Sequence, residues 1–175
     1  MIGKSVQDAI NNQINMEFLS SYIYLSMSAH FEHENLPGFA RWMHAQGEEE
    51  RLHAMKLFNF INDRGGRVAL QAIAQPPVEF GSPLEVFQKA LEHEQKVSAS
   101  INALYGLAAK EGDYAAQVML QWFINEQVEE EKTATAIVEQ LKRIGNDGPA
   151  LLILDREMGA RKAGGEEGGG EGGEA

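Results

Sequence analysis

Apolar residues recur along most of the chain at spacings of three and four, with short breaks between the stretches. This spacing is typical of helices that bury one face. We expect four long helices, over residues 5–34, 37–64, 83–110 and 114–144. Ser5 and Asp113 are suitable N-caps for the first and the fourth. A short apolar helix, ALLILDREMG, should follow the break GNDGP.

Residues 65–82 separate the second and third helices, and they are too long for a tight turn and too apolar for a flexible linker. We interpret them as an ordered crossover along the bundle. Two helical hairpins joined by one long crossover are a known way to connect four helices. The predicted fold is therefore all-α, an up-down-down-up four-helix bundle with a short fifth helix. Residues 1–160 should form this domain, and the Gly/Glu-rich residues 161–175 should stay disordered.

Polar residues interrupt the apolar stripe of every long helix near its middle. Glu17 stands on the stripe of the first helix, Glu50 and His53 on the second, and Glu94 on the third. On the fourth helix, Gln127 and Glu130 stand between Phe123 and Ala134. Each helix therefore places a carboxylate on its core face, with apolar residues on both sides.

The spacings of these polar residues repeat. Glu17 and Glu50 are 33 residues apart, as are Glu94 and Gln127, and adding 77 to 17, 50 and 53 gives 94, 127 and 130. Paired residues of two antiparallel helices with equal rise lie at similar heights when the turn is midway between them. The chain therefore resembles a diverged duplication of one helical hairpin. We expect six side chains to meet in one layer: Glu17, Glu50, His53, Glu94, Gln127 and Glu130.

Four buried carboxylates and an imidazole would be costly without compensating positive charge. No lysine or arginine stands on the stripes at this level, so we infer bound cations. A carboxylate-rich set with one imidazole and no thiolate suits iron or manganese better than structural zinc. The Glu-x-x-His spacing in ERLH is known from di-iron bundles but is weak evidence alone. The alternative, a solvated polar patch on misphased helices, conflicts with the apolar residues on both sides.

Composition narrows the function further. A formal net charge of −11 disfavours nucleic acid or an anionic membrane as a partner and favours cations. The absence of cysteine excludes disulfides and sulfur-ligated metal sites. The first residues lack the apolar core of a signal peptide, and no apolar run could span a bilayer, so we expect a cytoplasmic protein.

Several other residues have two readings. Glu126 and Glu129, with Glu49 on the second helix, form either a solvated acidic face or an accessory cation site. Tyr24 is either a core tyrosine or a hydrogen-bonding or redox group beside the metals. Trp122 should be a packing residue, and Glu131 an ordinary surface residue. We expect the remaining histidines to lie on the surface: His30, His33, His44 and His93.

The segments GEEERLHAMKLFNFINDRGG and FINEQVEEE closely resemble the second- and fourth-helix signatures of ferritins of the bacterial non-haem kind. Glu17, Tyr24 and Glu94 also match positions of that family, and the resemblance covers most of residues 5–160. It implies a hollow 24-subunit shell. It also implies a ferroxidase centre that oxidises Fe(II) with O2 or H2O2 and delivers Fe(III) to a mineral inside.

By this resemblance, Glu17 and His53 bind the first iron, Glu50 bridges both irons, and Glu94 and Glu130 hold the second. Gln127 either lies near the oxidant or is only a hydrogen-bonding neighbour of the ligands. The carboxylates that resemble the third iron site of bacterial ferritins are Glu49, Glu126 and Glu129, with Glu130 shared. Hard oxygen ligands favour Fe(III) over Fe(II), and two adjacent irons can give two electrons to dioxygen in one step.

The chain departs from related ferritins at several positions. Haem-binding bacterioferritins have a second Glu-x-x-His, where this chain has Gln127 and Glu130. They also have a methionine at the position of Arg51, so we expect no haem. Animal ferritins line their threefold channels with acids, and Gln117 and Leu120 replace them here, which does not favour that iron-entry route. The Gly/Glu tail is not a family feature.

Two other classes of function compete with iron storage. A purely catalytic di-iron enzyme, such as a rubrerythrin-like peroxidase, usually needs an electron-transfer module with cysteine-bound iron, and the chain has no cysteine. A non-catalytic shell subunit would not need the full set of ligands. Iron retention by the assembled protein would distinguish these classes.

Overall fold

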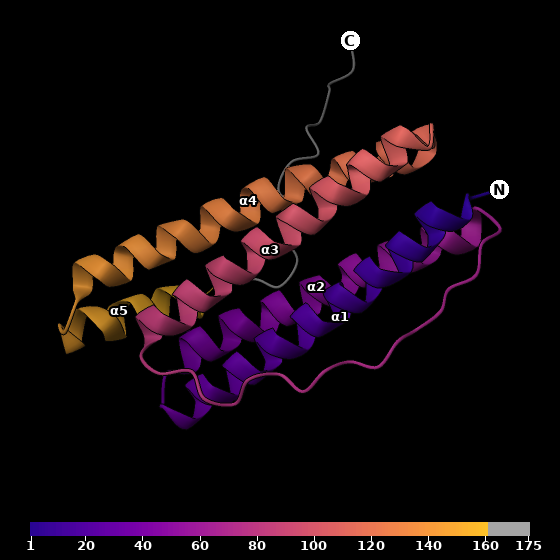
Figure 1. Cartoon of the computed structure of the whole chain (residues 1–175). Coiled ribbons are helices and arrows are strands. Elements are labelled where there is room, and N and C mark those ends of the chain that lie inside the picture. The colour runs from indigo at the N-terminus through magenta and orange to yellow at the C-terminus, as the bar shows by residue number, and fades with distance from the viewer. Residues whose placement is uncertain (161–175) are drawn as a thin grey trace, which may run out of the picture.

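Residues 1–160, which a computed structural model describes, form five helices and no strand (Figure 1). Their bounds are α1 (Lys4–His33), α2 (Pro37–Asp63), α3 (Pro83–Lys110), α4 (Tyr114–Ile144) and α5 (Gly148–Met158). α1 and α2 are antiparallel, α3 runs in the direction of α2, and α4 returns (Figure 1). The all-α, up-down-down-up bundle is therefore confirmed. No helix in this part of the chain is long and apolar enough to cross a membrane. The predicted tail, residues 161–175, lies outside the described residues.

The helix ends agree with the sequence except at the first. Asp113 caps α4 by accepting a hydrogen bond of 3.0 Å from the Ala116 amide. The N-cap prediction for Ser5 is wrong, because α1 begins at Lys4 with Gly3 as its N-cap. The physical reason lies upstream, where Ile2 donates its amide proton to the Arg64 carbonyl and packs against the core. The chain is thus already fixed before Ser5.

The crossover between α2 and α3 is ordered and runs along α1, as predicted (Figure 1). Asn11 on α1 donates to the Arg67 carbonyl at 3.1 Å and accepts from the Ala69 amide at 2.9 Å. Further along, the Ser26 hydroxyl donates to the Pro77 carbonyl at 2.6 Å. These bonds satisfy backbone groups that a strand or helix would otherwise pair. The crossover is therefore fastened along α1 at several points.

Two apolar clusters fill the bundle, one on each side of its middle. One includes Phe31, Phe39 and Phe87 near the α5 end, and the other includes Ile10 and Leu57 near the opposite end. The polar residues of the four stripes lie between these clusters. The polar residues that interrupt the apolar stripes therefore form a buried layer, and they are not a solvent-exposed patch.

A buried carboxylate fixes α5 to the start of α2. The Phe39 amide donates to Asp155 Oδ1 at 2.8 Å, and Asp155 is 5% exposed. The first amides of a helix lack partners within it, and a negative charge there also interacts favourably with the helix dipole. The contact is close, since a Cβ at Gly38 would lie 1.6 Å from the Asp155 carbonyl oxygen.

Asp155→Ala should lower the free energy of unfolding by about 1–3 kcal/mol, because it leaves a buried amide without an acceptor. Amide hydrogen exchange should accelerate in α5 and in the first turn of α2. Asp8→Ala is the control, since Asp8 is exposed and pairs only with exposed Lys4. Unchanged exchange in α5 would show that Asp155 does not hold it.

Candidate metal centre

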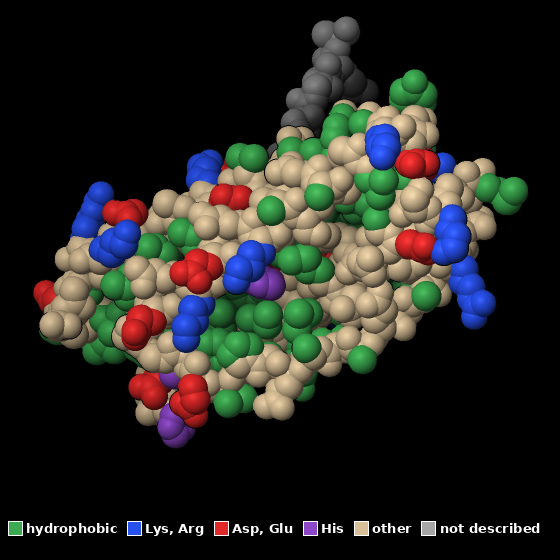
Figure 2. Space-filling model, in the orientation of Figure 1, with side chains coloured by type: hydrophobic (Ala, Val, Ile, Leu, Met, Phe, Trp, Pro, Cys, Tyr) green, Lys and Arg blue, Asp and Glu red, His purple; other side chains and the backbone are tan. Residues whose placement is uncertain are grey.

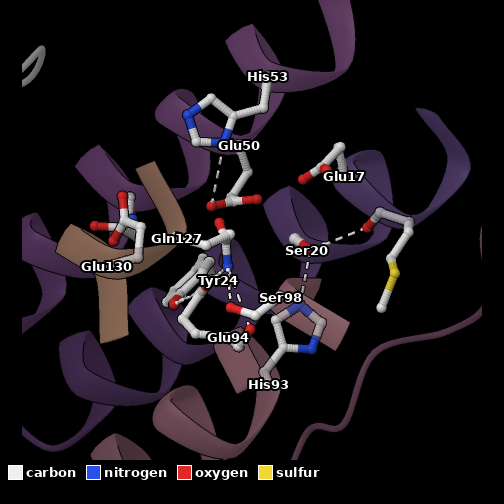
Figure 3. Close-up of polar contacts among 12 residues, drawn as sticks. Glu17, Ser20, Tyr24, Glu50, His53, His93, Glu94, Ser98, Gln127 and Glu130 are labelled. Atoms are coloured by element: carbon white, nitrogen blue, oxygen red, sulfur yellow. Dashed lines mark hydrogen bonds and ion pairs between the residues drawn. The ribbon is translucent and has the colours of Figure 1, made fainter. Parts of the chain in front are cut away.

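The six polar side chains predicted to share a layer come together in the middle of the bundle (Figure 3). They come from all four long helices, and each is at most 6% exposed. They are Glu17 on α1, Glu50 and His53 on α2, Glu94 on α3, and Gln127 and Glu130 on α4. The 33- and 77-residue spacings thus correspond to a real layer of side chains.

One half of this layer is an open ligand set. Glu17, Glu50 and His53 each offer a ligand atom, and these atoms lie within 4.8 Å of one another. His53 Nδ1 is 3.7 Å from Glu50 Oε1. Three carboxylate oxygens are buried and receive no hydrogen bond: Glu17 Oε2, Glu50 Oε1 and Glu50 Oε2. Buried polar atoms normally have hydrogen-bond partners. Here a bound cation could take the place of the missing partners, because the three residues offer suitable ligand atoms.

The other half is closed by hydrogen bonds. Among residues 1–160, neither Glu94 nor Glu130 belongs to a group of three ligand atoms that lie within 4.8 Å of one another. Tyr24 donates its hydroxyl proton to Glu94 Oε1, and Gln127 Nε2 donates to Glu94 Oε2 at 3.1 Å. Gln46 Nε2 donates to Glu130 Oε2 at 2.7 Å. Tyr24 is thus a hydrogen-bonding partner of the layer, one of the two roles expected for it.

Burial shifts the acid–base properties of the layer. It raises the pKa of Glu17 from 4.5 to about 7, and it raises the pKa of Glu50 well above the ordinary value, with further contributions from the charges of Glu94 and Glu17. Both neighbouring acids therefore keep protons at pH values where an exposed glutamate has lost its own.

His53 is ready to act as a ligand. Burial, and then the charge of Lys56, lower its pKa to about 4, so the imidazole is neutral at neutral pH. A neutral imidazole has a free lone pair for a metal. Trp122 packs edge-on against this ring with centroids 5.4 Å apart, and Lys56 Nζ lies 3.9 Å from the Trp122 centroid. Trp122 is therefore a packing residue, as expected.

A second group of ligand atoms adjoins the first through the same histidine. Glu49, His53 and Glu126 offer atoms within 4.8 Å of one another. Burial, and then the charge of Glu49, raise the pKa of Glu126. Glu129 is not part of this group, because its side chain is 66% exposed and pairs with Lys132 at 3.1 Å. The structure thus brings together two of the three predicted accessory acids and adds His53.

Two histidines lie deeper than expected. His93 Nε2 is 2.7 Å from the Ser20 hydroxyl, and burial lowers the His93 pKa to about 4. His30 Nε2 is 3.0 Å from the Gly81 carbonyl of the crossover. The prediction of a surface position is wrong for His93, which is half-buried against Ser20, whereas His30 stays partly exposed and contacts the crossover. His33 and His44 are exposed, as predicted.

Glu131 is also not the ordinary surface residue that was predicted. It is half-buried and accepts a hydrogen bond of 2.5 Å from the Ser98 hydroxyl. The two residues line a pocket of about 100 Å³, and Gln127 lines the same pocket. The small Ser98 on α3 explains how an acid beside the stripe can turn inward. Leu120, which stands where animal ferritins have a channel acid, is fully buried in the core, as its place on the apolar stripe predicts.

Two residues of the layer were not predicted to have a role. Gln13 lies one turn before Glu17 and donates to Glu17 Oε1 at 2.7 Å. Gln46 lies one turn before Glu50 but donates across the bundle to Glu130. Both are nearly inaccessible to solvent, at 2% and 0%. The i, i+4 spacing before a buried acid was the available signal for Gln13, whereas nothing in the sequence pairs Gln46 with Glu130.

The chain is similar to several named proteins and solved structures. A family model for the ferritin-like domain matches residues 7–144. A bacterial non-heme ferritin of Bacteroides fragilis is 45% identical over 161 residues, covering 92% of this chain and 100% of that protein. One from Staphylococcus aureus is 38% identical over 161 residues, covering 92% of this chain and 97% of that protein.

Two solved structures of Archaeoglobus fulgidus ferritin have nearly the same fold. A closed form engineered by mutagenesis superposes with a TM-score of 0.92 at 47% identity, covering 93% of this chain and 99% of that one. The open-pore ferritin superposes with a TM-score of 0.91 at 47% identity, covering 92% and 98%. These matches confirm the resemblance found in the sequence, and the chain belongs to the ferritin family.

Proposed function

We propose that the chain is an iron-storage protein whose buried carboxylate layer is a ferroxidase centre. The observation that carries this proposal is the set of three orphaned oxygens on Glu17 and Glu50, beside a neutral His53. Membership of the ferritin family supports iron as the cation. Oxygen donors with one imidazole and no sulfur also suit iron.

The two halves of the layer suggest two iron positions. Glu17, His53 and Glu50 would hold the first iron. Glu50, Glu94 and Glu130 would hold the second, after Glu94 exchanges a hydrogen bond for metal, while Glu130 would keep its bond from Gln46. Glu50 is placed to bridge because it alone of the four acids receives no hydrogen bond at either oxygen.

The chemistry balances without any other cofactor. Each of two Fe(II) ions loses one electron, and dioxygen takes both electrons and two protons to become H2O2. If H2O2 is the oxidant, the same two electrons and two protons convert it to two waters. Iron binding displaces the proton held by Glu50, and the carboxylates then stabilise the higher charge of Fe(III).

The group Glu49–His53–Glu126 is a possible next position for oxidised iron. It shares His53 with the first position, so an ion could pass from one to the other without leaving protein ligands. Its two acids are only half-buried, which gives it access to solvent. We propose that it is an accessory site on the route to the mineral.

An apolar surface supports assembly into a shell. Figure 2 shows hydrophobic side chains gathered over α1 and the crossover. Tyr22, Leu25, Ile73 and Val78 are 48%, 47%, 45% and 63% exposed and line one shallow depression. Large exposed apolar patches mark interaction sites. We propose that copies of the chain cover this face in a hollow 24-subunit assembly.

Light scattering combined with iron analysis tests the proposal. After aerobic additions of Fe(II), the assembled protein should keep far more iron per chain than its centre can hold. The reason is that product leaves the centre for an enclosed space. A small soluble oligomer that retains only the iron of the centre would favour a catalytic di-iron enzyme over a storage protein.

A further inference from the structure

Three of the four buried acids in the layer receive a hydrogen bond from a glutamine. Gln13 donates to Glu17 Oε1 and Gln46 donates to Glu130 Oε2, both at 2.7 Å. Gln127 donates to Glu94 Oε2 at 3.1 Å (Figure 3). The three glutamines are 2%, 0% and 4% exposed. The fourth acid, Glu50, receives no donor at either oxygen.

The orientation of these amides is fixed by chemistry. An ionised carboxylate only accepts hydrogen bonds, so the NH2 end of each glutamine must face its acid. The Gln13 Oε1 atom in turn accepts from the Ser100 hydroxyl at 2.5 Å. One face of that amide is thus held by α3 while the other holds an acid on α1. Gln46 instead connects two helices directly, because it lies on α2 and donates to an acid on α4.

The donor is uncharged at every one of these positions. A lysine or arginine in the same place would pair with the acid and balance its charge. An amide satisfies one carboxylate oxygen and restricts the rotation of the acid, but it leaves the negative charge in place. These amides therefore orient the acids without supplying positive charge, and they leave that role to a cation.

We propose that Gln13 and Gln46 are positioning residues that orient Glu17 and Glu130 for metal without supplying positive charge of their own. This inference rests on the proposed function, because it assigns the two residues a role toward the same irons. Gln46 is the residue to test first, because its bond joins α2 to an acid on α4 across the bundle.

Co(II) titration of the metal-free assembled protein tests the role of Gln46, because Co(II) is stable in air and its visible absorption reports its coordination. Gln46→Met keeps the length of the side chain and removes the donor. The affinity of the centre for a second Co(II) ion should fall by about tenfold to a hundredfold, which is the usual effect of losing a residue that orients a ligand. The first ion should keep its affinity and its spectrum.

Gln46→Lys tests whether the donor must be uncharged, because it replaces the neutral amide by an ammonium group. The ammonium should occupy the place of the second cation, so only one Co(II) should bind at the centre. The metal-free variant should also unfold at a higher temperature than the unmodified protein. Gln140→Lys is the matched control, because Gln140 is exposed on α4, the helix that carries Glu130, and should change neither result.

The outcomes separate this inference from the proposed function. Co(II) ions that belong to the centre are identified by their loss in Glu50→Gln. If the unmodified protein binds no such ions, the proposed function fails. If it binds two, and Gln46→Met binds both with unchanged affinities and spectra, only the positioning role is overturned. Should Gln46→Lys fail to assemble, Gln46→Met alone decides.

Discussion

Glu50→Gln is expected to slow rapid Fe(II) oxidation by at least about a hundredfold while making the metal-free protein more stable. The rate falls because Glu50 is the acid shared by both iron positions. The stability rises because both Glu50 oxygens are buried without a donor and lie beside Glu17 and Glu94. Removing that repulsion and desolvation should add about 1–3 kcal/mol to the free energy of unfolding.

Stopped-flow absorbance after mixing Fe(II) with the metal-free protein measures the rate, and chemical denaturation measures the stability. Glu48→Gln is the control, since Glu48 lies two residues away but is exposed and pairs with Arg51. It should leave both quantities unchanged. A Glu50→Gln protein that is less stable than the unmodified one, with a normal rate, would mean that Glu50 is a structural acid.

The metal-free protein should lose stability as the pH rises from about 5 to about 8. Glu17 has a folded pKa of about 7 against 4.5 when exposed, so the folded state holds a proton that the unfolded state has lost between these values. Stability falls with pH wherever the folded state binds more protons. The shift corresponds to about 3 kcal/mol for Glu17 alone. The raised pKa of Glu50 extends the loss to higher pH.

Bound metal should reverse this trend. A cation replaces the protons on the acids, so metal affinity and its stabilising effect should increase over the same pH range. Thermal unfolding at several pH values, with and without Co(II), compares the two states. The account would be contradicted if the metal-free protein gained stability between pH 5 and pH 8.

The periodicity of the sequence was sufficient to predict the fold and the layer of the site. Apolar stripes gave the four helices, and their polar interruptions identified Glu17, Glu50, His53, Glu94, Gln127 and Glu130 as neighbours. This worked because a bundle core tolerates buried acids only where another group compensates them. Residues on the stripes could therefore be predicted to meet.

Which particular side chains bond to one another could not be predicted in the same way. The bond from Gln46 to Glu130 depends on the rotation of α2 against α4, and the 33- and 77-residue spacings do not determine that rotation. His93 is half-buried beside the small Ser20. Such pairings between helices depend on side-chain size and helix rotation, which periodicity does not define.

The replacement of Glu129 by His53 in the accessory group has a similar cause. Glu126 and Glu129 share one face of α4, but Glu129 lies one turn further along and pairs with Lys132 on its own helix. His53 on α2 lies at the height of Glu126 and comes within ligand distance. The sequence showed the acidic face but not which residue of the opposite helix would complete it.

Anomalous X-ray diffraction at the iron edge, from crystals of the metal-free protein exposed to Fe(II) without oxygen, tests the central claim most directly. The account predicts two neighbouring iron peaks in the buried layer. One should lie among Glu17, Glu50 and His53, and the other among Glu50, Glu94 and Glu130. Iron found only on surface acids, with the layer empty and its hydrogen bonds intact, would contradict it.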